Sequence, residues 1–355
     1  MRKDQNPQRT PITTALTALI LSIGGLFCSP PECRPSQVIE WRRSTPFPEA
    51  RAGCAVGVIH GHLTVAGGTF WQGTKGNWTK KIFSASVHAL NPINQEWEKL
   101  PDLPVPLGYA ASAVIDNKLF VIGGYTGNEV NRGIFMLEKR SDGYKWSAFG
   151  DLPEDRLFAR AVSVDKCIYL LGGTTALEAF DAKGTCCTSK TAVNSLMVLD
   201  TTDPARVWKQ LPPFPGAKRF LFAAETDGKS VWIFGGIHQE TENGPARKFR
   251  DALQYNLAQA NWKNLPPLPS DTINTDPLTS LIVNDRIIFV SFAKRVWELD
   301  LKTLKYSELN PFPEEVFVDK FVWLNDVIVG AGGENNIEGP RRRSDWTFIG
   351  RYVPK

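Results

Sequence analysis

Histidine is scarce in this chain, with only four residues among 355. There is no Cys-x-x-Cys pair and no cluster of cysteine with histidine, so the usual zinc ligand sets are missing. The six cysteines have no spacing from which disulfide pairing can be read. The sequence therefore predicts no metal site.

An excess of charge of one sign is also absent. The formal net charge is +4, and the basic residues are scattered apart from the run Arg341–Arg343. A protein that binds nucleic acid concentrates basic residues on one face or along one element. We therefore expect no nucleic-acid partner.

Long apolar runs are lacking everywhere except at the N-terminus. There the run TTALTALILSIGGLFCS, residues 13–29, follows the basic residues Arg2, Lys3 and Arg9. A short apolar core behind positive charges is typical of a secretory signal peptide. The pattern predicts a signal peptide and short leader over residues 1–34, with export to the periplasm or outside the cell. Because the run is close to the minimum spanning length, a single N-terminal membrane anchor is the alternative.

A glycine pair follows a short apolar run of β-forming residues at five places. The runs are HLTVAGG, KLFVIGG, CIYLLGG, SVWIFGG and VIVGAGG, which end at Gly68, Gly124, Gly173, Gly236 and Gly333. After the first four come a polar loop, a second apolar run, a tryptophan and a proline-rich phrase such as KLPDLP. These second glycines are 56, 49, 63 and 97 residues apart. The widest gap is two units of the kelch period, which is roughly 50 residues.

The unit missing from the widest gap lacks only its glycines. SLIVNDRIIFVSFAKRVWELDLKTLKYSELNPFP has both apolar strands and the closing phrase, but Ser291 and Phe292 occupy the glycine positions. A unit of four short strands cannot bury both of its faces, so neighbouring units must stack. The sequence therefore predicts an all-β, six-bladed kelch β-propeller.

The last unit, from about Glu314 to Lys355, lacks a tryptophan with a proline phrase. Both occur near the other end of the chain, in VIEWRRSTPFP at residues 38–48. We therefore expect the N-terminal strand to complete the last blade, which removes both sheet edges. This organisation predicts one domain over residues 35–355.

Two loops contain residues suited to binding a ligand. The first-blade loop TFWQGTKGNWTKKIF includes Trp71 and Lys81, which could stack on a sugar face and attract a carboxylate. Its aromatic residues could equally anchor the loop. The fourth-blade loop ends in Arg250 and Asp251, for which the sequence suggests a local ion pair.

The closing loop, GGENNIEGPRRRSD, places Glu334 directly after a glycine pair and Arg343 at the start of the next strand. A carboxylate and a guanidinium that face one another there could hold an acidic sugar and move a proton. A salt bridge that merely ties the loop together is the alternative. Arg341 and Arg342 leave open which arginine is the partner.

Across nearly the whole chain after the leader, the sequence resembles the exported kelch-type N-acetylneuraminate epimerases, or sialic acid mutarotases. It resembles their cyclically permuted branch most. The similarity is carried by GGTFWQGTKGNWTKKIF, LPVPLGYAASAV, KFRDALQYN and GGENNIEGPRRRSDW. It implies that Glu334 is the catalytic acid/base and Arg343 its partner, although the loop between them is longer than in the family. Trp71, Lys81, Tyr109 and Arg219 are the predicted substrate-binding residues. Tyr109 and Arg219 each follow a proline phrase, which should orient them toward the channel.

The resemblance implies that the chain interconverts the α and β anomers of N-acetylneuraminate or a related sugar acid. This reaction needs no cofactor, and its only expected partner is the small-molecule sugar. A non-catalytic kelch propeller that binds a glycan or a protein is the alternative. A copper radical oxidase of similar architecture needs two suitably placed histidine ligands, which the sequence does not offer.

Overall fold

The structure is a computed structural model that describes residues 38–74, 77–176, 191–238, 247–269, 278–335 and 342–353, without the side chains of residues 74, 77–79 and 342. The predicted leader, Arg341 and the side chain of Arg342 lie outside this description. Within the described ranges, no helix has the length and apolar character to cross a membrane. Pro35–Lys355 form one compact unit.

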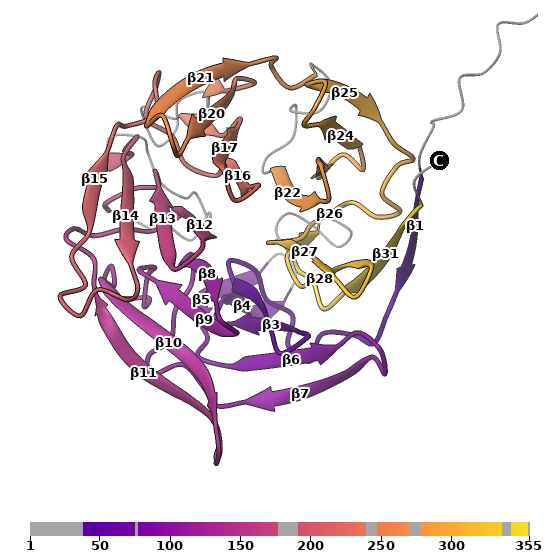
Figure 1. Ribbon diagram of the computed structural model, residues 1–355. Helices are drawn as coiled ribbons and strands as arrows, with labels where there is room; N and C mark the ends of the chain where they lie inside the picture. The colour runs from indigo at the N-terminus through magenta and orange to yellow at the C-terminus, as the bar shows by residue number, and fades with distance from the viewer. Residues whose placement is uncertain are drawn as a thin grey trace, which may run out of the picture. The chain divides into compact units, whose positions relative to one another are not determined.

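Six four-stranded antiparallel sheets follow one another around a central axis (Figure 1). Blade one contains β2 (Ala55–Ile59), β3 (His62–Ala66), β6 (Val87–Asn91) and β7 (Glu96–Leu100). Blade two contains β8 (Ala111–Ile115), β9 (Lys118–Ile122), β10 (Gly133–Arg140) and β11 (Gly143–Asp151). Blade three contains β12 (Arg160–Val164), β13 (Cys167–Leu171), β14 (Leu196–Asp200) and β15 (Lys209–Leu211).

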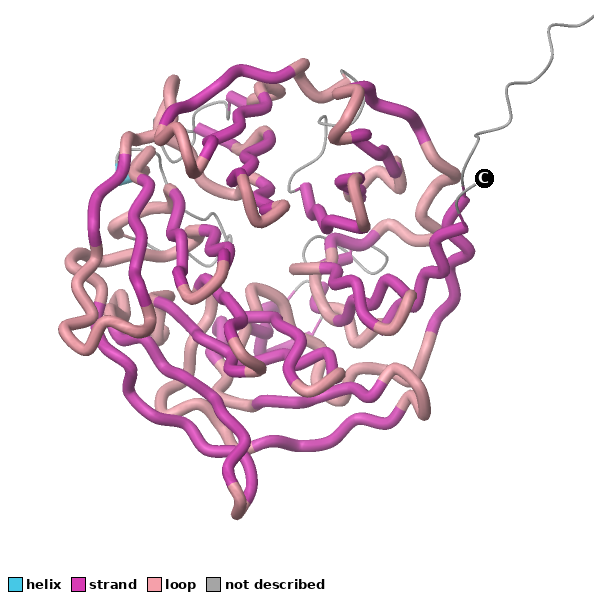
Figure 2. The backbone as a smooth tube through the Cα atoms, viewed as in Figure 1, coloured by secondary structure: helices cyan, strands magenta, loops and turns pink. Residues whose placement is uncertain are grey.

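The second half of the ring repeats this plan. Blade four contains β16 (Ala223–Thr226), β17 (Ser230–Phe234), β20 (Ala252–Asn256) and β21 (Asn261–Leu265). Blade five contains β22 (Leu278–Val283), β23 (Arg286–Ser291), β24 (Val296–Asp300) and β25 (Lys305–Glu308). Blade six contains β27 (Phe321–Leu324), β28 (Val327–Ala331), β31 (Thr347–Val353) and β1 (Val38–Arg43). The predicted all-β, six-bladed propeller is confirmed (Figure 2).

Three smaller sheets extend from the blades. They are β4 (Thr69–Thr74) with β5 (Asn77–Phe83), β18 (Ile237–His238) with β19 (Arg247–Lys248), and β26 (Val316–Phe317) with β29 (Glu334–Asn335) and β30 (Arg342–Arg343). All three involve segments that directly follow a glycine pair. Two of these sheets therefore carry four of the predicted site residues: Trp71 and Lys81 in β4 and β5, and Glu334 and Arg343 in β29 and β30.

The N-terminal strand closes the ring. β1 pairs antiparallel with β31 from Val38–Val353 to Arg43–Phe348. The Asn310 side chain of blade five accepts a hydrogen bond from the amide of Ile39 at 2.7 Å and donates one to its carbonyl at 2.9 Å. This confirms the expectation that the first strand completes the last blade.

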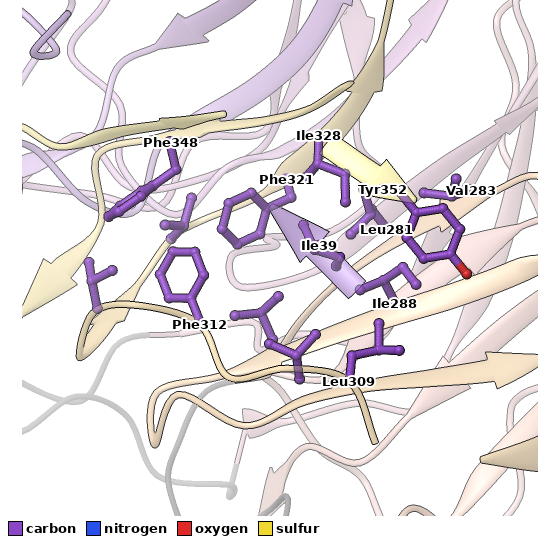
Figure 3. Close-up of a cluster of buried hydrophobic side chains, with 14 residues drawn as sticks. Ile39, Leu281, Val283, Ile288, Leu309, Phe312, Phe321, Ile328, Phe348 and Tyr352 are labelled. Carbon is purple, nitrogen blue, oxygen red and sulfur yellow. The ribbon is translucent and has the colours of Figure 1, made fainter. Parts of the chain in front are cut away.

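The core lies between neighbouring blades. The cluster between blades five and six includes Ile39 from β1, Ile288 from β23 and Phe321 from β27 (Figure 3). Phe312 packs edge-on against Phe348, with ring centroids 4.7 Å apart. Each blade therefore buries an apolar face only by contact with its neighbour, as the repeat requires.

The regular spacing of tryptophans within the repeat has a direct structural reason. The indole nitrogens of Trp97, Trp146 and Trp262 donate to carbonyls in the proline phrase of the preceding blade, at Thr45, Pro101 and Pro212. In blade five, the hydroxyl of Tyr306 donates in the same way to Pro266 at 3.1 Å. These tryptophans therefore tie adjacent blades together.

The glycine pairs are needed where the chain turns tightly into the loops at the channel mouth. Gly333 has φ +99°, and a Cβ there would collide with the carbonyl of Phe317. Blade five has no such loop, because β23 and β24 are joined by a tight turn in which Ser291 accepts from the amide of Lys294 at 3.1 Å. Ser291 and Phe292 can therefore replace the glycines.

Truncation of Ile39 to alanine should lower the free energy of unfolding by about 2–5 kcal/mol, because it leaves a cavity in the cluster that closes the ring. Chemical denaturation measures the change. Ile93 is 78% exposed, so Ile93→Ala serves as the matched control and should change stability by less than about 0.5 kcal/mol. Equal stability of the two variants would contradict a supporting role for β1.

Candidate functional site

Five blades place the residue after the glycine pair at an equivalent position at one mouth of the channel. Each of these residues is bridged to the segment that leads into the innermost strand of its blade. They are Thr69, Tyr125, Thr174, Ile237 and Glu334. Glu334 is therefore the only carboxylate that the repeat itself brings to this set of positions.

Glu334 and Arg343 form an ion pair across β29 and β30. The two residues are direct neighbours in the ladder, and Nη1 of Arg343 donates to Oε1 of Glu334. The Arg343 side chain is 5% exposed, whereas that of Glu334 is 34% exposed. The guanidinium is thus fixed inside the protein, and the carboxylate reaches the solvent.

Thr69 of blade one provides the other partners of Arg343. Nε of Arg343 donates to the Thr69 carbonyl at 3.0 Å, and Nη2 donates to the Thr69 hydroxyl at 2.9 Å. Each of the three guanidinium nitrogens therefore donates a hydrogen bond. This arrangement holds the paired carboxylate of Glu334 in one place at the mouth.

Tyr109, Lys81 and Trp71 continue the network into blade two and the first loop. The Tyr109 hydroxyl lies 3.4 Å from that of Thr69 and accepts a hydrogen bond from Nζ of Lys81 at 3.0 Å. Nζ of Lys81 is also 4.7 Å from the ring centroid of Trp71, its cross-strand neighbour. Five of the six predicted site residues therefore lie in one connected group.

The backbone at Tyr109 projects this ring over the seam between blades. Tyr109 has φ +62°, and its ring stacks on Phe158 with centroids 4.4 Å apart. A Cβ on Gly53 would lie 2.7 Å from the Tyr109 ring, so only glycine there leaves it room. The repeat pattern alone does not explain why Gly53 and Tyr109 occur where they do. Tyr109 was nevertheless expected near the channel.

Asp319 interacts electrostatically with both members of the ion pair and was missed by the sequence analysis. Its two carboxylate oxygens accept from the amides of Gly53 and Cys54, each at 2.9 Å. Burial raises the pKa of Asp319, Glu334 adds to that rise, and the two amides and Arg343 oppose it. The feature of the sequence that could have indicated Asp319 is its place just before β27, the innermost strand of blade six.

Negative neighbours keep Arg343 charged. Burial lowers the pKa of its guanidinium, but the negative charges of Glu334 and Asp319 outweigh this, so the pKa lies above its ordinary value. The mouth therefore combines a fixed cation, a solvent-accessible carboxylate, a phenol hydroxyl and a lysine. Such groups can move a proton and bind an anionic molecule.

Comparison with known proteins agrees with this architecture. The Kelch motif matches residues 50–104 and 106–142. The chain is a six-bladed β-propeller with Kelch motifs in its first two blades.

Parts of this kelch propeller are similar to N-acetylneuraminate epimerases. The protein from Haemophilus influenzae (strain PittEE) is 41% identical over 69 residues, which cover 19% of this chain and 18% of that protein. The protein from Escherichia coli O139:H28 (strain E24377A / ETEC) is 28% identical over 115 residues, or 28% of this chain and 31% of that protein. Beta-scruin from Limulus polyphemus is 27% identical over 90 residues, or 25% of this chain and 10% of that protein.

Arg219 lies inside blade four of the kelch propeller and not at the mouth. It is 1% exposed, pairs with Asp251, and donates from Nη1 to the carbonyl of Gly235 at 3.1 Å. Its guanidinium also lies 4.2 Å from the ring centroid of Phe249. Its expected orientation toward the channel is therefore corrected, because this cation stays buried beside a carboxylate and a carbonyl.

The expected local pairing of Arg250 with Asp251 is also corrected. Arg250 donates from Nε and Nη2 to the carbonyl of Leu268, at 2.9 and 2.7 Å, while Asp251 pairs with Arg219. Adjacent residues of an extended chain point to opposite sides, so these two side chains reach different partners.

Among the residues described for the kelch propeller, no group of three or more His, Cys, Asp or Glu side chains could hold a metal ion. His88 lies beside Arg51, with Nδ1 3.3 Å from Nη2. Burial lowers the pKa of His88, and the positive charge of Arg51 lowers it further. This histidine therefore belongs to the packing of blade one.

Replacement of Thr69 by valine should lower the free energy of unfolding by about 1–3 kcal/mol, because it leaves Nη2 of the buried Arg343 without its acceptor. Chemical denaturation measures this change. Thr45→Val is the control: Thr45 is exposed, so its stability should stay within about 0.5 kcal/mol of wild type. Unchanged stability of Thr69→Val would indicate that the Thr69 hydroxyl does not support the site.

Proposed function

We propose that this kelch propeller is a mutarotase that interconverts the α and β anomers of N-acetylneuraminate or a closely related sugar acid. The Glu334–Arg343 pair carries the proposal, because it puts a fixed carboxylate at the channel mouth within one network with Tyr109, Lys81 and Trp71. The partial similarity to N-acetylneuraminate epimerases supports the choice of substrate.

The reaction opens and recloses the sugar ring. Glu334 takes the proton from the anomeric hydroxyl and passes it to the ring oxygen as the bond between that oxygen and the anomeric carbon breaks, which leaves a carbonyl and a free hydroxyl. After rotation, this hydroxyl attacks the other face of the carbonyl. Glu334 takes the proton of the attacking hydroxyl and passes it to the former carbonyl oxygen, so its carboxylate is ionised again at the end of each half. No atom is gained or lost over the cycle.

Arg343 acts as a positioning residue in this mechanism. Its three nitrogens already donate to Glu334 and to Thr69. It therefore orients the carboxylate of Glu334 and has no nitrogen without a hydrogen bond to offer the sugar. A lysine at this position could not donate in three fixed directions.

Lys81 and Trp71 are the better groups for the substrate itself. The ammonium of Lys81 attracts the sugar carboxylate, and the indole of Trp71 stacks on a C–H face of the ring. The Tyr109 hydroxyl lies between Lys81 and Thr69 and can exchange a hydrogen bond with the ring oxygen. Substrate and carboxylate would meet above the seam of blades six, one and two.

Glu334→Gln should lower kcat for anomer exchange about 10²–10⁴-fold, because glutamine cannot accept and return the proton. One-dimensional NMR of freshly released α-N-acetylneuraminate follows the exchange. Arg343→Lys should also lower kcat and leave KM near that of wild type, since the guanidinium orients the base without holding the sugar.

The ion pair of Glu308 with Arg295 in blade five supplies matched controls. Glu308→Gln and Arg295→Lys alter the same kinds of groups away from the mouth and should retain wild-type kcat. If wild type does not increase the rate of anomer exchange above the rate in buffer, the proposal is contradicted. Full activity of Glu334→Gln would remove Glu334 from the mechanism.

Lys81→Met should raise KM for the sugar acid about tenfold, because one charged contact to the carboxylate is lost. Steady-state exchange rates over a range of substrate concentrations give KM and kcat separately. Lys80 is exposed and directly precedes Lys81 in β5, so Lys80→Met is the control. An equal KM in the two variants would argue against Lys81 as the carboxylate contact.

A non-catalytic propeller that binds a glycan or protein is the second candidate. The missing mouth loop of blade five favours it. Binding of the sugar acid by wild type, without faster anomer exchange, would select this function.

A further inference from the structure

The segment that leads into β2 connects separate parts of the candidate site. The carbonyl of Arg51 accepts a hydrogen bond at 2.7 Å from the amide of Gly333, which directly precedes Glu334. Two residues further on, the carbonyl of Gly53 accepts from the amide of Tyr109 at 2.8 Å. A shift of this segment would therefore move Glu334 and Tyr109 relative to each other.

Asp319 of blade six holds this segment in place. It is 8% exposed, and its two carboxylate oxygens accept from the amides of Gly53 and Cys54, each at 2.9 Å. Two neighbouring amide donors need two acceptor oxygens. A carboxylate has two, whereas a carboxamide has one oxygen and a group that only donates. Asp319 is therefore matched to this pair of amides.

Gly53, Tyr109 and Phe158 occupy equivalent positions in blades one, two and three, each directly after a residue that is bridged to the mouth. All three have positive φ, at 72°, 62° and 52°. The amide of Phe158 donates to the carbonyl of Tyr109 at 3.0 Å, just as the amide of Tyr109 donates to the carbonyl of Gly53. The amide of Gly53 donates in turn to the side chain of Asp319. A chain of hydrogen bonds across four blades thus ends at this carboxylate.

Tyr109 depends on this support. A residue other than glycine at positive φ is strained and persists only where its surroundings hold it. The Tyr109 ring lies between Gly53, where a Cβ would be 2.7 Å from it, and Phe158, whose ring centroid is 4.4 Å away. Loss of the Asp319 acceptors would release Gly53 and free one side of the ring. The Tyr109 hydroxyl would then lose its fixed place beside Lys81.

We propose that Asp319 is a positioning residue that fixes the Tyr109 ring relative to Glu334 across the seam between blades six and one. The inference rests on the proposed mutarotase function, in which the Tyr109 hydroxyl meets the ring oxygen of the sugar. Asp319 acts through the backbone of Gly53 and need not touch the substrate. It also interacts electrostatically with Glu334 and Arg343, so one carboxylate acts on both halves of the site.

A second buried carboxylate supplies a matched control. Asp319 and Glu225 line a cavity of about 50 Å³ between the innermost strands, where they face two cations, Arg160 and Lys320. Glu225 is 9% exposed and accepts from a hydroxyl of blade five at 2.6 Å. Glu225→Gln therefore removes an equally buried carboxylate whose hydrogen bond joins blades four and five and not the blades of the site.

Fluorine NMR of the full chain labelled with 3-fluorotyrosine tests the effect without catalysis. The chain has seven tyrosines, and the signal lost in Tyr109→Phe belongs to Tyr109. Asp319→Asn should shift or split this signal, because the ring no longer has one fixed position, and should leave the other signals in place. Glu225→Gln should leave the Tyr109 signal at its wild-type position. An unchanged Tyr109 signal in folded Asp319→Asn would overturn the proposal.

Hydrogen exchange on wild type adds a measurement that needs no variant. The amides of Gly53, Cys54 and Tyr109 should exchange as slowly as those of the inner strand β2, because each has a fixed acceptor. Exchange at the rate of amides open to solvent would refute the positioning role, even if Asp319→Asn does not fold.

Anomer exchange tests the consequence for the reaction. Asp319→Asn should lower kcat about 10–100-fold, since a misplacement of about 1 Å can cost about 10²-fold. Because Asp319 acts through Tyr109, addition of Tyr109→Phe to this variant should lower kcat by no more than about twofold further. Glu225→Gln and Tyr109→Phe should instead multiply in their effects. Multiplied effects of Asp319→Asn and Tyr109→Phe would contradict the proposal.

The two kinds of readout separate this inference from the proposed function. Failure of wild type to accelerate anomer exchange would remove the mutarotase function, and the Tyr109 signal would still decide whether Asp319 fixes the ring. A normal Tyr109 signal together with wild-type kcat in Asp319→Asn would reject the role of Asp319 and leave the mutarotase function intact.

Discussion

The antiparallel pairing of β1 with β31 is the interaction on which the rest of this molecule depends. A propeller blade buries its faces only against its neighbours, so an open ring would expose two apolar faces and two strand edges. The ladder from Val38–Val353 to Arg43–Phe348 holds blade six from both ends of the chain. Blade six is thereby fixed beside blade one.

The candidate site lies across this closure seam. Arg343 of blade six donates twice to Thr69 of blade one, although the two residues are 274 positions apart in the sequence. Tyr109 approaches from blade two and fills the space that Gly53 leaves. No single blade contains the site, and its geometry exists only while the ring is closed. Stability of the scaffold and order of the site are therefore coupled.

Buried arginines occur throughout the propeller, and their partners distinguish them. Arg51, Arg156 and Arg219 are each at most 1% exposed and donate to backbone carbonyls within their own blades, at Ser86, Gly172 and Gly235. All three also pair with carboxylates that reach solvent, Glu49, Glu154 and Asp251. Arg343 likewise pairs with a partly exposed carboxylate, Glu334, but it differs because it also donates to a residue of another blade, Thr69. The link between blades therefore distinguishes Arg343, and neither burial nor an exposed partner does so alone.

The sequence alone determined the scaffold and part of the site. Glycine pairs, tryptophans and proline phrases at a regular spacing are local requirements of each blade, so they can be read without coordinates. The same repeat placed Glu334 at the mouth, and the resemblance to a family selected Arg343.

The tertiary structure decided which residues meet. It joined Trp71, Lys81 and Tyr109 to the Glu334–Arg343 pair and kept Arg219 within blade four. It also brought Asp319, Arg160, Glu225 and Lys320 into the channel. These four residues are close together only because six blades converge on one axis. The spacing of residues in the sequence does not show which side chains meet at that axis.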